Sequence, residues 1–349
     1  MHLLHTGGTI ACRVDYATGA VVASFRPEEI LALVPELSGL VRLHTQEVCN
    51  TQSEFMRFST YNAMAKGVLQ AVEAGARGVI ITHGTDTMHY SAAALAFMLE
   101  NLPVPVVLVG SQRSADRGSS DNYVNLLGAV RFVMRGLPGV FVAMHASSSD
   151  DEVCVHLGVR ARKMHTSRRD AFRSINAAPF GVVDVKSGEV RAPALPAVKG
   201  ACRVLPFRED MRVGLVMTHP QMFASELRAY EGFDGLVLAG TGLGHAPIEG
   251  CAEHEDLFGV LASLARKMPV VMASQCLYGR VNLDVYSPGR RIRDAGVLGH
   301  GLDMTPECAF VKLAWLLSTF PERVRELFQE DLRGEISARS QQDGFPEEK

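Results

Sequence analysis

Thr82-His83-Gly84-Thr85-Asp86-Thr87 follows directly after the apolar run Gly78-Val79-Ile80-Ile81, and this junction decides the fold. The N-terminus repeats the arrangement, with His5-Thr6-Gly7-Gly8-Thr9-Ile10-Ala11 after Leu3-Leu4. Short continuous apolar runs of this kind are typical of buried parallel strands. In an open α/β sheet, the carboxyl ends of the strands line the ligand-binding crevice. The sequence therefore predicts an α/β fold in which both threonine-rich turns face one crevice.

The two turns carry the residue types that a threonine nucleophile needs. Thr9 follows Gly7-Gly8, which let the backbone approach a ligand closely and leave N–H groups to face an oxyanion. A threonine hydroxyl is a weak nucleophile and needs a base to activate it. Thr85 supplies a second hydroxyl, and Asp86 supplies a carboxylate that could bind a substrate ammonium. The alternative is that the threonines cap the helices that follow. One turn alone favours capping, but two turns after buried strands favour catalysis.

The segment from Arg160 to Arg173 is strongly basic and leaves several interpretations open. Such a run is usually a solvated face, and it can also be a nucleic-acid patch. Phe172 is its only aromatic residue, so stacking on single-stranded nucleic acid is not supported. Lys163 in this run would act as a base toward a threonine hydroxyl if it is buried. Ser111 lacks the G-x-S-x-G frame of a serine hydrolase, so a nucleophile elbow of that kind is not supported.

Composition limits the class of protein. The 349 residues are 47% hydrophobic, which is ample for two domains, and the net charge of −3 gives no overall attraction to nucleic acid or anionic membrane. The seven cysteines are scattered singly, as in a reduced cytoplasmic protein. No signal-peptide pattern, bilayer-spanning run or zinc-ligand spacing is present. We expect a cytoplasmic protein with no direct membrane contact, no metal and no cofactor.

Apolar runs alternate with helical patterns along the chain, which predicts a mainly parallel sheet. Prolines and glycines between residues 186 and 210 interrupt this pattern and mark a boundary. The expected parts are an N-terminal domain at 1–195, a linker at 196–211, a C-terminal domain at 212–335 and a disordered tail at 336–349. Strands are expected at residues 79–82, 104–110, 140–144, 213–217, 235–239 and 270–273. Helices are expected near residues 60–74, 92–99, 122–134, 223–230, 253–266, 306–317 and 321–331, with another beginning near Pro27 and a loop or short hairpin at 13–24.

Together the two turns resemble the double signature of the L-asparaginase/glutaminase superfamily. The resemblance extends from about Leu3 to Ile336 and implies a two-domain asparaginase-like fold, with a larger, mainly parallel N-terminal α/β domain and a smaller C-terminal α/β domain. Longer strings are closer to one branch, the D subunits of archaeal-type glutamyl-tRNA(Gln) amidotransferases. These strings are residues 15–21, 86–90, 162–170, 240–245 and 277–282.

The resemblance implies a catalytic role for each matching residue. Thr9 would be the nucleophile that attacks the side-chain amide. Thr85 and Lys163, together with Asp86, would activate a hydroxyl and relay its proton. Tyr16, on the loop after the first turn, would be a lid residue that contacts the nucleophile on closure. Backbone N–H groups at Thr9 and Thr85 would form the oxyanion hole.

The resemblance also implies how the substrate binds. Ser53 and Glu54 would hold its α-carboxylate and ammonium, Asp86 would share the ammonium, and Gly8 would allow the backbone to approach it. Asparaginases usually carry Gln at the position of Glu54, and Glu is nearer to the amidotransferase branch. His5 replaces a small residue, which could crowd the strand end or add a polar contact.

These expectations combine into one functional hypothesis with two alternatives. The chain would be an amidohydrolase that cleaves the side-chain amide of glutamine or asparagine. It would form a homodimer and supply ammonia in a glutamyl-tRNA(Gln) amidotransferase, with a separate tRNA-binding partner subunit. That branch carries an additional N-terminal β-rich domain, which we expect this chain to lack because the first turn begins a few residues after Met1. The alternatives are a free-standing L-asparaginase and a non-catalytic scaffold or amino-acid-binding subunit.

Overall fold

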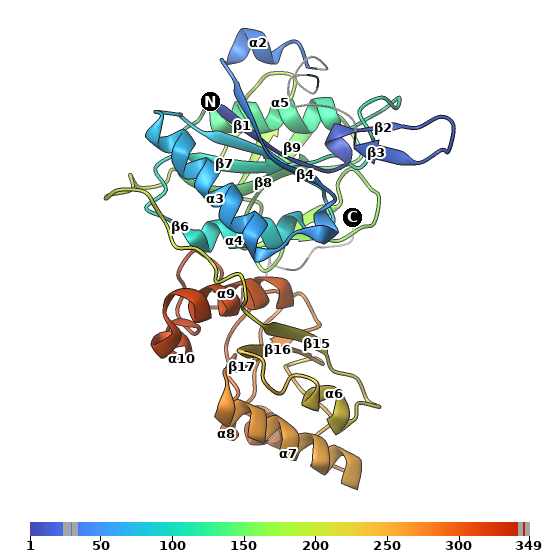
Figure 1. The fold of residues 1–349 in the computed structure, drawn as a ribbon, viewed down its shortest axis with the longest axis vertical. Helices are drawn as coiled ribbons and strands as arrows, with labels where there is room; N and C mark the ends of the chain where they lie inside the picture. The colour runs from blue at the N-terminus through green and yellow to red at the C-terminus, as the bar shows by residue number, and fades with distance from the viewer. Residues whose placement is uncertain (24–28, 30–33, 341–344, 346–349) are drawn as a thin grey trace. The chain divides into compact units, whose positions relative to one another are not determined.

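The computed structural model describes residues 1–23, 29, 34–340 and 345. The chain divides into two compact units, both drawn in Figure 1. The first unit comprises Met1–Ser174 and Pro179–Pro206, and the second comprises Ile175–Ala178 and Phe207–Lys349. Each unit contains its own parallel strands, with helices packed on them.

An eight-stranded sheet lies at the centre of the first unit, in the order β13-β12-β9-β8-β7-β5-β1-β4. The parallel strands are β4 (His44–Thr51), β1 (His2–Gly7), β5 (Val79–Thr82), β7 (Pro105–Val109) and β8 (Gly139–His145). The strands β9 (Glu152–Leu157), β12 (Gly181–Asp184) and β13 (Val190–Arg191) continue the sheet in antiparallel pairs. The prediction of a mainly parallel α/β domain is therefore confirmed.

Burial on both faces explains why the central strands are continuously apolar. Leu3 of β1 and Ile80 of β5 belong to the core that also contains the apolar face of α5 (Asn122–Val133). Leu4 points the other way, toward Gly67 of α3 (Phe58–Glu73). Helices α3 and α4 (Met88–Met98) cover that second face of the sheet (Figure 1). Helices cover both faces of the sheet. A ligand can therefore reach the sheet at the carboxyl ends of its strands, where the polar turns lie.

Short elements complete the first unit. The strands β2 (Cys12–Val14) and β3 (Val21–Ala23) pair antiparallel, so the expected loop or hairpin at 13–24 is a hairpin in its described part, up to residue 23. The other short pairs are β6 (Leu99–Glu100) with β14 (Arg203–Val204) and β10 (Ala161–Lys163) with β11 (Phe172–Ser174). Single turns are η1 (Thr9–Ala11), α2 (Leu37–Leu40) and η2 (Ser53–Phe55). The helix expected to begin near Pro27 lies outside the described residues.

The second unit is built on a three-stranded parallel sheet of β15 (Val213–Met217), β16 (Gly235–Gly240) and β17 (Val270–Ser274). The helix α9 (Pro306–Thr319) packs on all three strands. The proline at its start fits its first turn, and the Thr305 hydroxyl caps it by accepting the N–H of Cys308 at 3.2 Å. Three further helices of this unit are α6 (Ala224–Arg228), α7 (Ala252–Lys267) and α8 (Ser287–Asp294).

The single helix predicted at 321–331 is wrong. The chain instead forms η3 (Pro321–Arg323) and the short helix α10 (Val324–Leu327). Beyond them, the Glu335 carboxylate accepts the N–H of Leu332 at 3.1 Å and pairs with the buried Lys312 ammonium at 2.6 Å. A buried charge must be paired, so the chain turns back toward Lys312 and cannot extend the helix.

The segments expected as a linker and as a tail each make a defined backbone contact. Residues 196–211 contain β14, which pairs with β6. At the start of the tail, the Ser337 N–H donates to Asp303 at 3.0 Å, while residues 341–344 and 346–349 lie outside the described part. All seven cysteines are free thiols. Within the described ranges, no helix has the length and apolar character that crossing a bilayer requires.

Candidate active site

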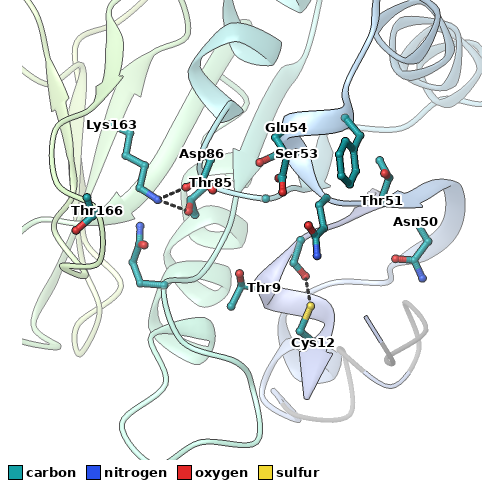
Figure 2. A pocket seen from close by; sticks show the side chains of 15 residues that line it. Thr9, Cys12, Asn50, Thr51, Ser53, Glu54, Thr85, Asp86, Lys163 and Thr166 are labelled. Carbon is teal, nitrogen blue, oxygen red and sulfur yellow. Dashed lines mark hydrogen bonds and ion pairs between the residues drawn. The ribbon is translucent and has the colours of Figure 1, made fainter. Parts of the chain in front are cut away.

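A pocket of about 570 Å³ opens at the carboxyl edge of the first unit's sheet. It collects the loops that follow β1, β4, β5 and β7, together with the β10–β11 hairpin (Figure 2). Most of its lining groups are polar. The lining residues are Gly8, Thr9, Cys12, Asn50, Thr51, Gln52, Ser53, Glu54, Phe55, Gly84, Thr85, Asp86, Gln112, Lys163 and Thr166.

Glycine lets three of these loops come into backbone contact. Gly8 has a φ of 85°, in the left-handed region, and a Cβ placed on it would lie 2.2 Å from the Gly84 nitrogen. A Cβ on Gly84 would in turn lie 2.8 Å from the Cβ of Ser53. Because no side chain separates these loops, Thr9, Thr85 and Ser53 are brought to the same pocket.

Replacing Gly8 with alanine is expected to reduce both stability and catalysis. The new methyl group would overlap the Gly84 backbone, and a displacement near 1 Å at a reacting group costs on the order of 10²-fold in rate. Gly75→Ala is the matched control, since Gly75 has a similar φ of 78° and nothing within 4 Å of a Cβ. It should lose only about 1 kcal/mol from backbone strain. Steady-state rates and urea unfolding measure both effects; equal losses in the two variants would contradict the close approach.

The hydroxyls of the two turns do not serve as helix caps. Thr9 begins η1, and Gly8 at its N-cap has no side chain to cap with. Thr87 stands at the N-cap of α4 without capping it, and its hydroxyl donates to the Ser53 carbonyl at 2.6 Å. Thr85 accepts a hydrogen bond from Lys163. The capping alternative is therefore wrong for these turns, and Thr87 instead fastens the loop that carries Ser53.

Lys163 points into the pocket from the end of β10 (Figure 2). Its Nζ donates to the Thr85 Oγ1 at 2.8 Å and to the Asp86 Oδ1 at 2.7 Å. The Lys163 side chain is only 9% exposed, whereas the Asp86 side chain is 68% exposed. The interpretation of the basic run as a solvated face is therefore wrong for Lys163, and the triad of Thr85, Asp86 and Lys163 is assembled as expected.

The rest of the basic run is organised by internal acidic groups. Asp170 is buried between Arg168, whose Nε donates at 2.8 Å, and Arg173, whose Nη2 donates at 2.9 Å. The hydrogen bond from Arg168, followed by that from Arg173, lowers the pKa of the Asp170 carboxyl to about 2. Arg169 pairs with Asp150 at 2.7 Å. These pairs hold the loop beyond β10 in place, so the basic run shapes one wall of the pocket.

Buried histidines support the strand ends beneath the pocket. The Nδ1 of His5 lies 2.7 Å from the Thr82 hydroxyl, so the unusual residue before the first turn makes the polar contact. His83 is bound to the Gly84 carbonyl at 2.7 Å through Nδ1 and to the Ser91 hydroxyl at 2.8 Å through Nε2. Burial lowers the pKa of His83 to about 4. A neutral His83 therefore anchors the second turn from below.

Three buried histidines are expected to make the stability depend on pH. Burial lowers the pKa of His83 to about 4, and that of His89 and His156 to about 3. All three are neutral in the fold near pH 7. Below about pH 6.5 the unfolded chain binds protons that the fold rejects, so the unfolding free energy falls by about 1.4 kcal/mol per pH unit for each histidine until the folded pKa is reached. Urea titrations between about pH 7 and pH 5 measure this slope. His156→Gln should flatten it; an unchanged slope would refute the assignment.

The structure separates the other predicted site residues. Ser53 and Glu54 line the pocket; Ser53 is buried and Glu54 is exposed at the rim. Tyr16 lies in the turn between β2 and β3, where it is 84% exposed and not among the lining residues. It reaches the pocket only if this hairpin moves.

Sequence reasoning missed Gln112 and Thr166 as lining residues. Gln112 lies beside Ser111, and the signal that identifies it is its place just after the predicted strand at 104–110. Thr166 is hidden in the basic run. In the described part of the chain, no cluster of three or more histidine, cysteine, aspartate or glutamate side chains is arranged to hold a metal ion.

Comparison with known proteins places this geometry in a family. Residues 1–195 match the family described as "Asparaginase, N-terminal", and residues 212–328 match the "Glutaminase/Asparaginase C-terminal domain". The chain belongs to the asparaginase family. The asparaginase-like fold and the resemblance noted in the sequence are thus confirmed, and the chain is an amidohydrolase of the asparaginase/glutaminase type.

The chain is similar both to amidotransferase D subunits and to L-asparaginases. This member of the asparaginase family is 44% identical over 341 residues to the D subunit of the glutamyl-tRNA(Gln) amidotransferase of Methanosarcina mazei. The match covers 96% of this chain and 78% of the Methanosarcina protein. It is also 44% identical over 350 residues to the corresponding protein of Thermofilum pendens, covering 98% and 76%. Among solved structures, the thermostable L-asparaginase from Thermococcus kodakarensis is 33% identical, with a TM-score of 0.84 and coverage of 96% and 98%.

Proposed function

We propose that this chain hydrolyses the side-chain amide of glutamine or asparagine through a threonyl acyl-enzyme, with Thr9 as the nucleophile. The Thr9 oxygen would attack the amide carbon, the C–N bond would break, and the nitrogen would leave as ammonia after taking up a proton. Water would then cleave the ester to release glutamate or aspartate. The observation that carries the proposal is the Lys163 ammonium, bound to Thr85 and Asp86 in the same pocket as Thr9.

The division of labour follows from burial and charge. Lys163 is nearly buried and touches the Thr85 hydroxyl. As the neutral amine, it would take the Thr85 proton while Thr85 takes the proton of the attacking Thr9 hydroxyl, and the proton would then pass to the leaving nitrogen. Asp86 is largely exposed and, with Glu54, presents carboxylates for the substrate ammonium, while Ser53 would bind the α-carboxylate. Because Gly8 has no side chain, nothing on it would cover the backbone N–H groups near Thr9, which an oxyanion hole needs to be accessible. Tyr16 would close over Thr9 when the β2–β3 hairpin moves.

We infer that the physiological role is the ammonia-generating subunit of a glutamyl-tRNA(Gln) amidotransferase. The identity of 44% with amidotransferase D subunits across almost the whole chain supports this assignment. A net charge of −3 suits a subunit whose partner makes most contacts with tRNA. The chain would work as a homodimer with that separate tRNA-binding subunit, in the cytoplasm. Light scattering of the purified chain measures the homodimer, and a monomer would contradict it.

A free-standing L-asparaginase is the second candidate. The chain is similar to the L-asparaginase structure from Thermococcus kodakarensis, with 33% identity and a TM-score of 0.84. This structural similarity supports the free-standing enzyme as the second candidate.

Ammonia release separates the two candidates. The purified chain is assayed on L-asparagine and L-glutamine, alone and with an amidotransferase partner subunit and glutamyl-tRNA(Gln). The subunit role predicts little turnover of free glutamine alone and strong stimulation by partner and tRNA. High asparagine turnover by the isolated chain, unchanged by partner and tRNA, would assign the free-standing enzyme instead.

A further inference from the structure

Gln112 lines the pocket, yet the proposed reaction gives it no role. Its backbone is held rigidly. The Gln112 N–H donates to both carboxylate oxygens of Asp121, at 3.0 and 2.9 Å, and the next N–H, of Arg113, donates to the same group at 3.0 Å. Asp121 is fully buried and also accepts the side-chain N–H of Asn125 at 3.0 Å. Charge-assisted bonds of this kind are strong, so the loop after β7 presents Gln112 in a fixed position.

The side-chain nitrogen of Gln112 is buried and has no acceptor within the described part of the chain. A buried donor without a partner costs about 1–3 kcal/mol, and such groups are uncommon in folded proteins. Because Gln112 borders the pocket, a ligand that brings an oxygen to this position would remove the penalty.

The order of the strands shows which end of the substrate meets Gln112. Along the carboxyl edge the order is β7, β5, β1, β4, so Gln112 lies beyond Thr85, and the loop of Ser53 and Glu54 lies beyond Thr9. Figure 2 shows Ser53 and Glu54 on one side of Thr85, with Lys163 and Thr166 on the other. The α-amino and α-carboxyl groups belong at the Glu54 end, so the side-chain amide of the substrate extends toward Gln112.

A side-chain amide offers one good acceptor, its carbonyl oxygen, because the nitrogen lone pair is delocalised. We propose that Gln112 contacts the substrate by donating its side-chain N–H to that carbonyl oxygen, an inference that rests on the proposed amidohydrolase function. The oxygen becomes negative when Thr9 attacks, so this bond strengthens in the tetrahedral intermediate. Gln112 would thus be a donor to the oxyanion beyond the backbone N–H groups of the two turns.

Ligand binding in the Thr9→Ala protein tests the contact without turnover. L-Glutamine and L-norvaline share the ammonium, the carboxylate and the chain length, but only L-glutamine has the carbonyl oxygen; L-asparagine and L-2-aminobutyrate form a second pair. Gln112→Met keeps the volume and removes the donor. We expect it to weaken the binding of L-glutamine and L-asparagine about tenfold, the value of one hydrogen bond. The two analogues without the oxygen should change less than about twofold. Gln52→Met is the matched control at the opposite end of the pocket, and it should shift both members of a pair equally.

Each outcome is decisive. Equal weakening of amide and analogue by Gln112→Met would mean that Gln112 only fills space, and unchanged binding of both would mean that it makes no contact; either overturns the proposal. If Gln112→Met does not fold, Gln112→Glu replaces it, because a carboxylate of the same shape cannot donate and should discriminate against the amides in the same way. If Thr9→Ala binds no amide at all before Gln112 is changed, the proposed function fails and the inference falls with it.

Discussion

Thr9→Ala is expected to abolish ammonia release while leaving the fold intact. Without the hydroxyl, no acyl-enzyme forms, and removing a nucleophile from a preorganised site costs at least about 10⁴-fold in rate. Thr9 is only half-buried and begins the single turn η1, so loss of its side chain should change the unfolding free energy by less than about 1 kcal/mol. Coupled detection of ammonia measures the first effect, and urea unfolding measures the second.

The control for this prediction is Thr9→Ser, which keeps the attacking oxygen. It should retain measurable turnover, reduced because a serine hydroxyl lacks the methyl group that restricts its rotamer. Mass spectrometry of the quenched reaction should find an acyl adduct on the wild-type chain and none on Thr9→Ala. An alanine variant that releases ammonia within tenfold of the wild type would remove Thr9 from the mechanism and leave Thr85 as the candidate nucleophile.

The strands that the sequence predicts best are continuous apolar runs, whether fully buried like β5 or half-buried like β15. β5 and β15 begin and end at the expected residues because their apolar runs are bounded by polar turns. β4 was missed, although it pairs with β1 along most of its length, because it is the last strand of the sheet and its segment His44–Thr51 is largely polar and exposed. Such an edge strand forms because its backbone pairs with the neighbouring strand, and the amino-acid composition of its segment does not reveal that pairing.

Some residues of the site can be predicted from their local sequence, and others only from contacts between distant parts of the chain. Thr9, Thr85 and Asp86 follow from turns placed after apolar strands, so sequence alone brings them to one edge. Lys163 is separated from Thr85 by 78 positions, and only the pairing of β10 with β11 directs it to the pocket. Its role rested on family resemblance, because a basic run has no signal for burial. Gln112 needs the buried carboxylate of Asp121 to fix its loop, and a contact of that kind is visible only in three dimensions.

Lys163→Met is expected to lower the rate of amide hydrolysis by about 10²–10⁴-fold, as loss of a general base does. Methionine keeps the length and removes the ammonium that binds Thr85 and Asp86. The fold should survive, because the partner Asp86 is largely exposed and an ion pair with an exposed group contributes about 0–1 kcal/mol. Initial rates and urea unfolding of the same preparation separate the two effects. Lys186→Met is the matched control, since Lys186 is 85% exposed and pairs with a surface carboxylate, Asp151; it should hydrolyse amides at the wild-type rate.

Lys163→Arg distinguishes proton transfer from charge alone. Arginine would keep a positive charge near Thr85 and Asp86, but its guanidinium does not deprotonate in proteins and cannot take a proton from a hydroxyl. If Lys163 moves the proton, the arginine variant should be as inactive as the methionine variant. If it only holds Asp86 in place, arginine should restore most of the rate, and Lys163 would become a positioning residue. A near-normal rate in Lys163→Met would refute both roles, because the contacts at 2.8 and 2.7 Å would then serve the wall of the pocket and not the reaction.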